Sequence, residues 1–253
     1  MCIRDSISII VPAYNEERRL PATLIDIIDY CEKENMLYEI IVVDDGSSDQ
    51  THAVIEKFKR IRSEVRGIQL PKNYGKGHAV RTGALNANGS LILFTDADGA
   101  TPIQELKRLL PEIINGADIA IGSRALFNKE TAVKTVWYRK IIGRIFNFLV
   151  NTFLIPNIAD TQCGFKLFTR SAANFVFNHQ KSDGFSFDLE LLFLARKADL
   201  SVKEVAINWT NIPGSKVNLI VDSAKMFIDI FKCSIRHRSI TPQDYQNTLT
   251  EKI

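Results

Sequence analysis

Short apolar strand-like runs alternate with helix-like segments along the N-terminal part of the chain, and this alternation constrains the fold most strongly. The predicted strands are 7–11, 38–43, 67–70 and 91–95, and the predicted helices between them are 20–35, 51–63 and 76–87. The strand runs are continuously apolar, so both faces of the sheet are expected to be covered. The pattern therefore predicts an α/β fold with a mostly parallel central sheet flanked by helices.

Polar residues follow each of these predicted strands. The polar segments are 12–17, 44–49, 73–77 and 96–99. Ligands of parallel sheets bind outside the carboxyl ends of the strands, so these segments are expected to meet in one crevice.

The fourth polar segment contains two carboxylates one residue apart, Asp96 and Asp98. Such neighbours point to opposite faces of a strand unless the strand ends there, and Gly99 and Pro102 indicate that it does. At that edge the pair can hold one hard cation, which would also bind two diphosphate oxygens. An ordinary solvated turn is the alternative interpretation of the pair by itself.

Two other polar segments carry candidate ligand contacts. Asp45 is predicted to accept a hydrogen bond from a nucleobase or ribose, because adjacent Asp44 and Asp45 exceed what a turn and a helix cap need. Lys76 lies between two glycines at a helix start, where free amides and a cation suit an anion or a sugar edge; a flexible turn is the alternative. There is no Walker loop and no GxGxxG after the first strand, which argues against an NAD-dependent dehydrogenase.

Size and composition limit the remaining possibilities. The 253 residues, with a formal net charge of +3, fit one large α/β domain or two small ones. The four cysteines lack zinc or disulfide spacing, so a reducing compartment is expected. No signal peptide precedes the first strand, and no apolar stretch approaches the roughly 18–20 residues that cross a bilayer.

Two segments combine basic and apolar side chains. Residues 131–159 contain no acidic residue, and residues 219–238 end in Arg236, His237 and Arg238. Basic residues next to aromatic and apolar ones are typical of helices that lie in the lipid headgroup region. We therefore expect amphipathic membrane-associating helices near 134–155 and 219–238; a core helix with a solvated basic end is the alternative for the first. Nucleic acid is not an expected partner.

Eight motifs occur in an order that resembles family 2 inverting glycosyltransferases with the GT-A fold. They are VPAYNE (11–16), VVDDGSSDQT (42–51), NYGKGHAVRTG (73–83), FTDADG (94–99), GSR (122–124), DTQCGFKLF (160–168), FDLELL (187–192) and NWTNIPGSKV (208–217). The last three are similar to one branch, the dolichyl-phosphate β-glucosyltransferases, close relatives of the dolichyl-phosphate mannose synthases. The matches set the expected GT-A domain at 7–238, between a polar lead (1–6) and a polar tail (239–253).

The resemblance implies roles for individual residues. Together with Lys76, the nucleotide-sugar contacts would be Pro12, Tyr14, Glu16, Val43, Asp45, Asp96 and Ala97. Asp96 and Asp98 would hold Mg²⁺ or Mn²⁺, with Asp98 as the main ligand. The mannose synthases carry a polar residue where this chain has Ala100, so water or diphosphate oxygens would have to complete the metal's ligands.

The acceptor side is implied in the same way. Its expected phosphate contacts are Arg124, Arg139, Lys140 and Lys216, and the expected catalytic residues are Asp98, Arg124, Asp188 and Lys216. Asp188 and Glu190 match positions where related enzymes place a base. In this chain they would act as a base, or they would orient the acceptor or the cations that bind it. For Glu190, a helix-surface carboxylate is the alternative.

The expected reaction is transfer of a hexose with inversion, glucose from UDP-glucose, onto a polyprenyl or dolichyl phosphate for glycan assembly. The enzyme would be peripheral at the cytoplasmic face of a membrane: the endoplasmic reticulum in a eukaryote, the cell membrane in a prokaryote. One alternative is a mannose synthase that uses GDP-mannose, or another family 2 sugar transferase. The other is a nucleotide-sugar or lipid-binding protein without turnover, which the intact acidic motifs oppose.

Overall fold

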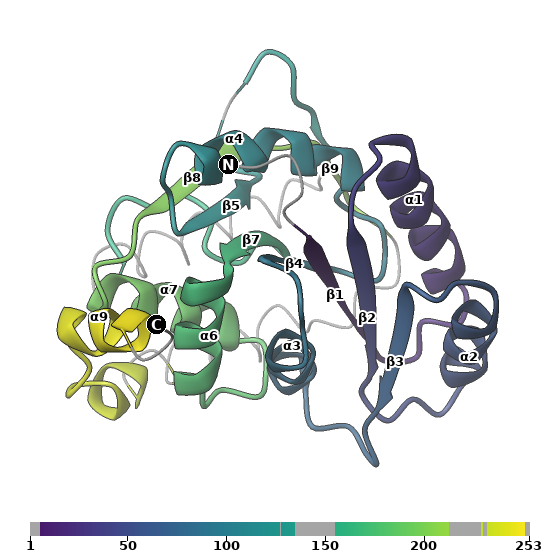
Figure 1. Ribbon diagram of the computed structural model, residues 1–253, viewed down its shortest axis with the longest axis horizontal. Coiled ribbons are helices and arrows are strands. Elements are labelled where there is room, and N and C mark those ends of the chain that lie inside the picture. The colour runs from purple at the N-terminus through teal and green to yellow at the C-terminus, as the bar shows by residue number, and fades with distance from the viewer. Residues whose placement is uncertain (1–5, 127, 135–154, 213–228, 230–231, 251–253) are drawn as a thin grey trace.

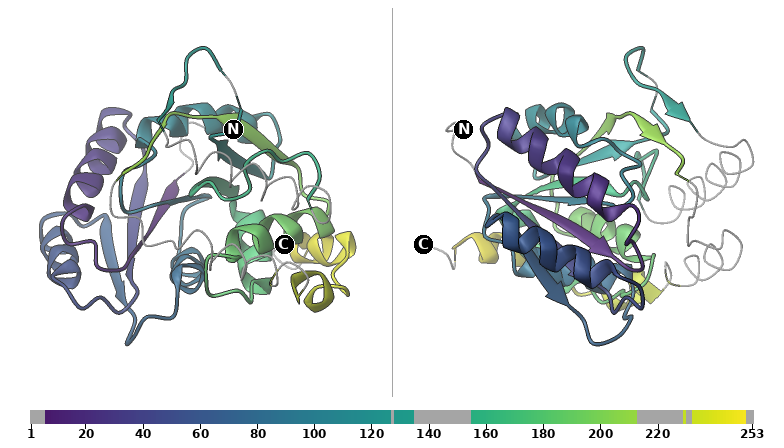
Figure 2. Two further views of the ribbon diagram at one scale, coloured as in Figure 1. Left: turned by 180° about the vertical axis from the view of Figure 1, so that it is seen from behind. Right: turned by 90° about the vertical axis from the view of Figure 1, so that its right-hand side faces the viewer.

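The computed structural model describes residues 6–126, 128–134, 155–212, 229 and 232–250. Its centre is a seven-stranded mixed sheet with the order β3-β2-β1-β4-β7-β5-β8 (Figure 1). These strands are β1 (Ile7–Ala13), β2 (Tyr38–Asp44), β3 (Val65–Gln69), β4 (Leu91–Thr95), β5 (Ile119–Ser123), β7 (Phe165–Thr169) and β8 (Val202–Ala206). A short parallel ribbon of β6 (Val133–Lys134) and β9 (Trp209–Thr210) stands outside the main sheet (Figure 2).

Helices cover both faces of the sheet. They are α1 (Leu20–Lys33), α2 (Thr51–Ile61), α3 (Lys76–Leu85), α4 (Leu106–Ile114, preceded by the 3₁₀ turn η1, Ile103–Glu105), α6 (Arg170–His179), α7 (Phe187–Lys197) and α9 (Pro242–Thr250). One buried apolar cluster packs α1, α2 and α4 against the sheet, and another packs α3, α6, α7 and α9 against it. In Figure 1, α4 lies above the strands, and α3 and α6 lie below them. This arrangement confirms the predicted α/β fold.

The predicted N-terminal strands pair as expected. β1 pairs in parallel with β2 and β4, and β2 pairs in parallel with β3. The first helix ends two residues earlier than predicted, because Asn35 adopts a left-handed conformation with φ +50°. β3 begins at Val65 rather than at residue 67.

The sheet changes direction beyond β4. β7 lies between β4 and β5 and is antiparallel to both, whereas β5 and β8 are parallel. The fold also continues beyond residue 238, where the expected domain ends. Within the expected polar tail, α9 places Tyr245 in the core, and its hydroxyl forms hydrogen bonds with Asp118 and Ser171, each at 3.1 Å.

The two expected membrane-associating helices fall mostly outside the described residues. Of 134–155 and 219–238, the structure describes 134, 155, 229 and 232–238. Among the helices in the described part of the chain, none has both the length and the apolar character needed to cross a membrane.

Candidate active site

Asp44 and Asp45, at the end of β2, make different local contacts. The Asp44 side chain is fully buried and accepts a hydrogen bond from the Ser47 N–H at 2.9 Å, so it shapes the turn. Asp45 accepts from the backbone N–H groups of Tyr74 and Gly75, at 2.8 and 2.9 Å. Burial raises the pKa of the Asp45 carboxyl, against the lowering effect of these two amides. Asp45 therefore ties the end of β2 to the loop before α3.

The start of α3 is held closely against the segment before α7. Gly75 has φ +111°, and a Cβ there would lie 2.5 Å from the Asp183 carbonyl oxygen. At Gly77 a Cβ would lie 2.5 Å from the Ser182 carbonyl oxygen. The two glycines thus permit an approach that side chains would block, and this fixes the position of Lys76.

Lys76, at the start of α3, lies against the carboxylates at the end of β4. The Lys76 Nζ lies 2.6 Å from Asp96 Oδ1 and 5.2 Å from the centre of the Phe94 ring. Burial alone would lower the pKa of Lys76, but the charges of Asp96 and Asp188 raise it. This ion pair brings the start of α3 and the end of β4 together.

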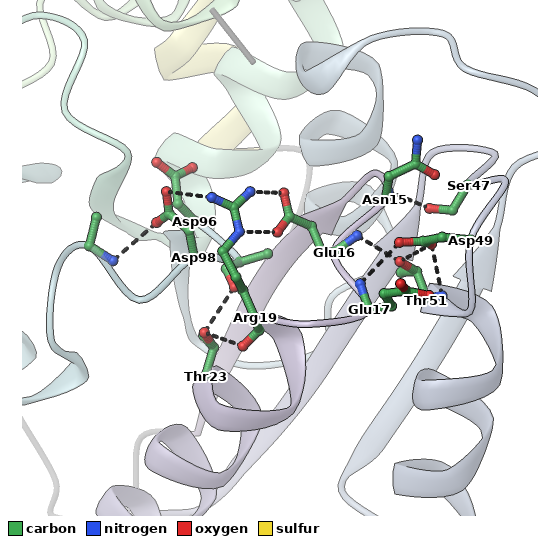
Figure 3. Close-up of polar contacts among 12 residues, drawn as sticks. Asn15, Glu16, Glu17, Arg19, Thr23, Ser47, Asp49, Thr51, Asp96 and Asp98 are labelled. Atoms are coloured by element: carbon green, nitrogen blue, oxygen red, sulfur yellow. Dashed lines mark hydrogen bonds and ion pairs between the residues drawn. The ribbon is translucent and has the colours of Figure 1, made fainter. Parts of the chain in front are cut away.

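Asp98 lies beside Asp96 and faces Arg19 (Figure 3). Its Oδ1 accepts from the Ala100 N–H at 3.0 Å, and its Oδ2 lies 4.0 Å from Arg19 Nη1. Burial and the negative charge of Asp96 raise the pKa of the Asp98 carboxyl. Between the two aspartates, the Ala97 carbonyl oxygen accepts from the Thr23 hydroxyl at 2.8 Å, which anchors the motif to α1.

These carboxylates fit a divalent cation. The side chains of Asp96 and Asp98 are 33% and 28% exposed, so both carboxylates can be reached from the solvent. Two like charges close together favour a cation between them, and hard oxygen ligands suit Mg²⁺ or Mn²⁺. A Cβ at Gly164 would lie 2.2 Å from Asp96 Oδ2, so only glycine leaves that carboxylate its present place.

Arg124 follows β5 and is held by a buried partner. Its Nε and Nη2 donate to the Asp160 carboxylate at 2.6 and 2.8 Å, and its guanidinium carbon lies 5.5 Å from the centre of the Trp209 ring. Burial alone would lower the pKa of Arg124, but Asp160 raises it strongly. Asp160, 2% exposed, thus serves as the partner of Arg124 rather than as a simple turn residue.

Asp188 is buried in an ion pair with Lys166, a residue that the sequence analysis did not single out. Both side chains are almost fully buried, and Lys166 Nζ also donates to the Cys163 carbonyl oxygen at 2.6 Å. Burial raises the pKa of Asp188, and the charges of Lys166 and Lys76 oppose this. Asp188 thus contacts a buried cation that is not among the expected acceptor contacts.

The surface alternative for Glu190 is wrong. Glu190 is 1% exposed and accepts from the N–H groups of Lys181 and Ser182 at 3.0 and 2.6 Å. Its other oxygen is 2.6 Å from Nε2 of His237, a residue to which the sequence analysis gave no site role. Glu190, His237 and Cys233 are the one group among the described residues whose three ligand atoms lie within 4.8 Å of one another. Hydrogen bonds already account for the Glu190 carboxylate, which holds residues 181 and 182 against α7.

The expected nucleoside contacts differ in exposure. Pro12 and Val43 are paired in the sheet, and the Val43 side chain is fully buried in the core. A contact between the Val43 side chain and a nucleoside is therefore excluded, which leaves its backbone. Tyr14 is half-buried after β1, and Glu16 forms an ion pair with Arg19.

Part of the acceptor set cannot be placed. Three of the expected phosphate contacts lie outside the described residues: Arg139, Lys140 and Lys216. The fourth, Arg124, is described. Sequence reasoning also missed Arg19, although its i,i+3 spacing from Glu16 is a signal for a side-chain pair.

The chain is similar to proteins of known family. The family Glycosyl transferase family 2 matches residues 8–177. A dolichyl-phosphate beta-glucosyltransferase of Drosophila melanogaster is 42% identical over 91% of this chain and 75% of its own length. The Homo sapiens protein of that name is 42% identical over 83% of this chain and 69% of its own length.

A solved structure has the same fold. Glucosyl-3-phosphoglycerate synthase from Mycobacterium tuberculosis, in complex with Mn²⁺ and UDP-glucose, superimposes with a TM-score of 0.66 at 17% identity. The match covers 92% of this chain and 79% of that chain.

Proposed function

Because this chain belongs to glycosyl transferase family 2, we propose that it is a dolichyl-phosphate β-glucosyltransferase, which transfers glucose from UDP-glucose with inversion onto dolichyl or a similar polyprenyl phosphate. The proposal rests mainly on the pair Asp96 and Asp98, which faces Lys76 and Arg19. The relatives above support glucose and dolichyl phosphate as the substrates. A mannose synthase that uses GDP-mannose is the runner-up.

The donor half of the site binds the nucleotide. Lys76 and the backbone at the start of α3 suit the diphosphate, since cations and free amides stabilise phosphate oxygens. The end of β1 and the loop that Asp45 holds would enclose the nucleoside, with Tyr14 as the half-exposed side chain in that wall.

Asp96 and Asp98 would hold Mg²⁺ or Mn²⁺. When bound, the ion supplies positive charge that stabilises the leaving diphosphate. Since Ala100 has no ligand atom in its side chain, oxygens other than those of this residue complete the coordination. The solved neighbour of the same fold was crystallised with Mn²⁺.

The nucleophile in the acceptor half of the site is an oxygen of the lipid phosphate. A phosphomonoester has a second pKa of about 6, so its oxygen is already charged near neutral pH and needs no strong general base. This fits Asp188, which is buried with Lys166 rather than open to substrate. Asp160 orients the planar guanidinium of Arg124, which suits the acceptor phosphate. Arg139, Lys140 and Lys216 would bind the same phosphate.

We place the protein at the cytoplasmic face of a membrane through its basic and apolar segments. Replacing Arg139→Glu together with Lys140→Glu should weaken binding to anionic liposomes and raise the amount of acceptor lipid needed for half-maximal transfer. Sedimentation with liposomes measures the first effect, and unchanged sedimentation and acceptor dependence would contradict this placement.

A donor competition assay tests the substrate assignment. Radiolabelled UDP-glucose and GDP-mannose are each offered with dolichyl phosphate and Mn²⁺, and label is counted in the organic phase. We expect lipid-linked label from UDP-glucose and at most a trace from GDP-mannose. The opposite ratio would establish the runner-up.

A further inference from the structure

Arg19 is a basic residue at the donor site to which no role has been assigned above. It is the N-cap residue of α1, and its side chain is 22% exposed. Its Nη1 faces Asp98 Oδ2 at 4.0 Å, beside the carboxylates at the end of β4 (Figure 3). The guanidinium thus lies near Asp98, at a longer distance than the 2.6 Å that separates Lys76 from Asp96.

The orientation of this guanidinium is fixed. The Glu16 carboxylate accepts from Arg19 Nε at 2.6 Å and from Nη2 at 2.5 Å, which is a bidentate arrangement. Glu16 is itself anchored, because its N–H donates to the Thr51 hydroxyl at the start of α2 at 2.7 Å. Two of the three guanidinium nitrogens therefore bind Glu16, and the third is the one directed at Asp98.

A purely structural pair does not account for this direction. The Glu16–Arg19 pair spans the turn before α1, and such a pair would hold that turn wherever its cation points. Here the cation points at a carboxylate that is expected to share a divalent ion with a diphosphate. Oxygens that bind one such ion lie about 3 Å apart, so diphosphate oxygens there would come within reach of Nη1.

We propose that Arg19 is a donor-binding residue that binds the diphosphate of the nucleotide sugar and that, before the donor arrives, acts as a counter-charge for Asp98. Glu16 is then a positioning residue for Arg19 rather than a direct contact of the nucleoside. The inference rests on the proposed function for the identity of the donor.

The proposal predicts effects of opposite sign from one substitution. Without Arg19, Mn²⁺ alone should bind more tightly, by about threefold, because a positive charge close to Asp98 is gone. UDP should bind more weakly, by about tenfold or more, because a charge-assisted contact to phosphate is lost. Loss of local structure would instead weaken both.

The test uses the full chain with Arg19→Met and, as matched control, Arg18→Met, since Arg18 is the exposed neighbour in sequence. Mn²⁺ binding without nucleotide is measured by electron paramagnetic resonance, and binding of UDP and of uridine at saturating Mn²⁺ by calorimetry. Arg19→Met should show the two opposite shifts with uridine affinity unchanged, and Arg18→Met should match the wild type. Arg19→Lys, which keeps the charge, should lose less UDP affinity.

Three results would overturn the inference: unchanged UDP affinity in Arg19→Met, equal losses for UDP and uridine, or weaker binding of Mn²⁺ alone. None of these measurements needs the acceptor lipid. If UDP binding changes as expected but no glucose reaches dolichyl phosphate, the proposed function fails and the inference stands. If the wild type binds no UDP, both fail.

Discussion

The charged pairs on the two sides of β4 differ in how deeply they are buried. On the β1–β4 side, the Lys76 and Asp96 side chains are 24% and 33% exposed, and those of Arg19 and Asp98 are 22% and 28% exposed. On the β5–β7 side, the side chains of Asp160, Asp188 and Lys166 are 3%, 7% and 0% exposed, and only Arg124 among these charged groups, at 32%, reaches the surface.

This difference separates groups that can change partner from groups that cannot. A partly exposed charge can turn to a ligand because water and the ligand replace its old partner. A buried charge keeps its partner, since leaving it unpaired costs several kcal/mol. We infer that the first side exchanges its contacts when substrates bind, whereas the second holds a fixed frame for Arg124. The following substitutions test this contrast.

The largest effect on activity is expected at Asp98. Asp98→Asn keeps an acceptor for the Ala100 N–H but removes the charge, and transfer should fall by at least about 10³-fold, or roughly 4 kcal/mol. Because burial and Asp96 raise the pKa of Asp98, its ionised form destabilises the fold above that pKa. The free energy of unfolding should therefore stay the same or rise at pH 7.

Activity assays and urea unfolding of one preparation measure both effects. Asp26→Asn, at an exposed position of α1, is the control. Retained transfer, or a clear loss of stability, would show that Asp98 is a structural residue.

The largest effect on stability is expected at Lys166. Lys166→Met leaves the buried Asp188 carboxylate without its cation and should lower the free energy of unfolding by about 3–5 kcal/mol. Adding Asp188→Leu should recover part of this loss, as an apolar pair replaces the ion pair. Lys203→Met on the exposed side of β8 should cost under about 0.5 kcal/mol in the same urea titration. A loss below about 1 kcal/mol for Lys166→Met would contradict a fixed frame.

A smaller effect is expected at Asp160, which orients Arg124. Asp160→Asn should lower kcat/KM by about 10–100-fold, mainly through a higher KM for the lipid phosphate, since the guanidinium loses its charged partner. Arg124→Lys, which keeps the charge without the fork, should show a similar change. An unchanged KM in both variants would remove Arg124 from the acceptor site.

The same pair makes a prediction for pH. Burial alone would raise the pKa of Asp160, but Arg124 lowers it below its ordinary value. The pair therefore adds stability that is present above about pH 4 and is lost as pH falls through the lowered value. Acid unfolding of Asp160→Asn should accordingly depend less steeply on pH below 4 than that of the wild type.

The smallest effect is expected at Glu190. Glu190→Gln removes the charge that accepts from His237 and two backbone amides, and the free energy of unfolding should fall by about 1–2 kcal/mol. Thermal unfolding measures the loss. An unchanged melting temperature would mean that these contacts do not hold the segment before α7.

The same contrast between the two sides describes how much the sequence could predict. β1 to β4 follow one another with helices between, so short-range patterns indicated both the strands and the polar segments at their ends. Asp96, Asp98 and Lys76 were accessible to reasoning because each follows a strand that is adjacent in space to β1 or β2.

Beyond β4, pairing no longer follows chain order. β7 enters between β4 and β5 from a distant part of the sequence, which no local pattern specifies. Lys166 lies between Phe165 and Leu167, where a lone cation in a strand is expected to face solvent, yet its ion pair with Asp188 of α7 lets it be buried. Glu190 likewise has a helix pattern that gives no sign of its partner His237, 47 residues away.

The central claim is that the strand-end carboxylates serve metal-dependent transfer of glucose to a lipid phosphate. The most direct measurement incubates the protein with radiolabelled UDP-glucose, a polyprenyl phosphate and Mn²⁺, with and without EDTA, and counts label in the organic phase. We predict lipid label that EDTA abolishes and that Asp98→Asn does not form. Lipid label that persists in EDTA, or its absence with the wild type in Mn²⁺, would contradict the claim.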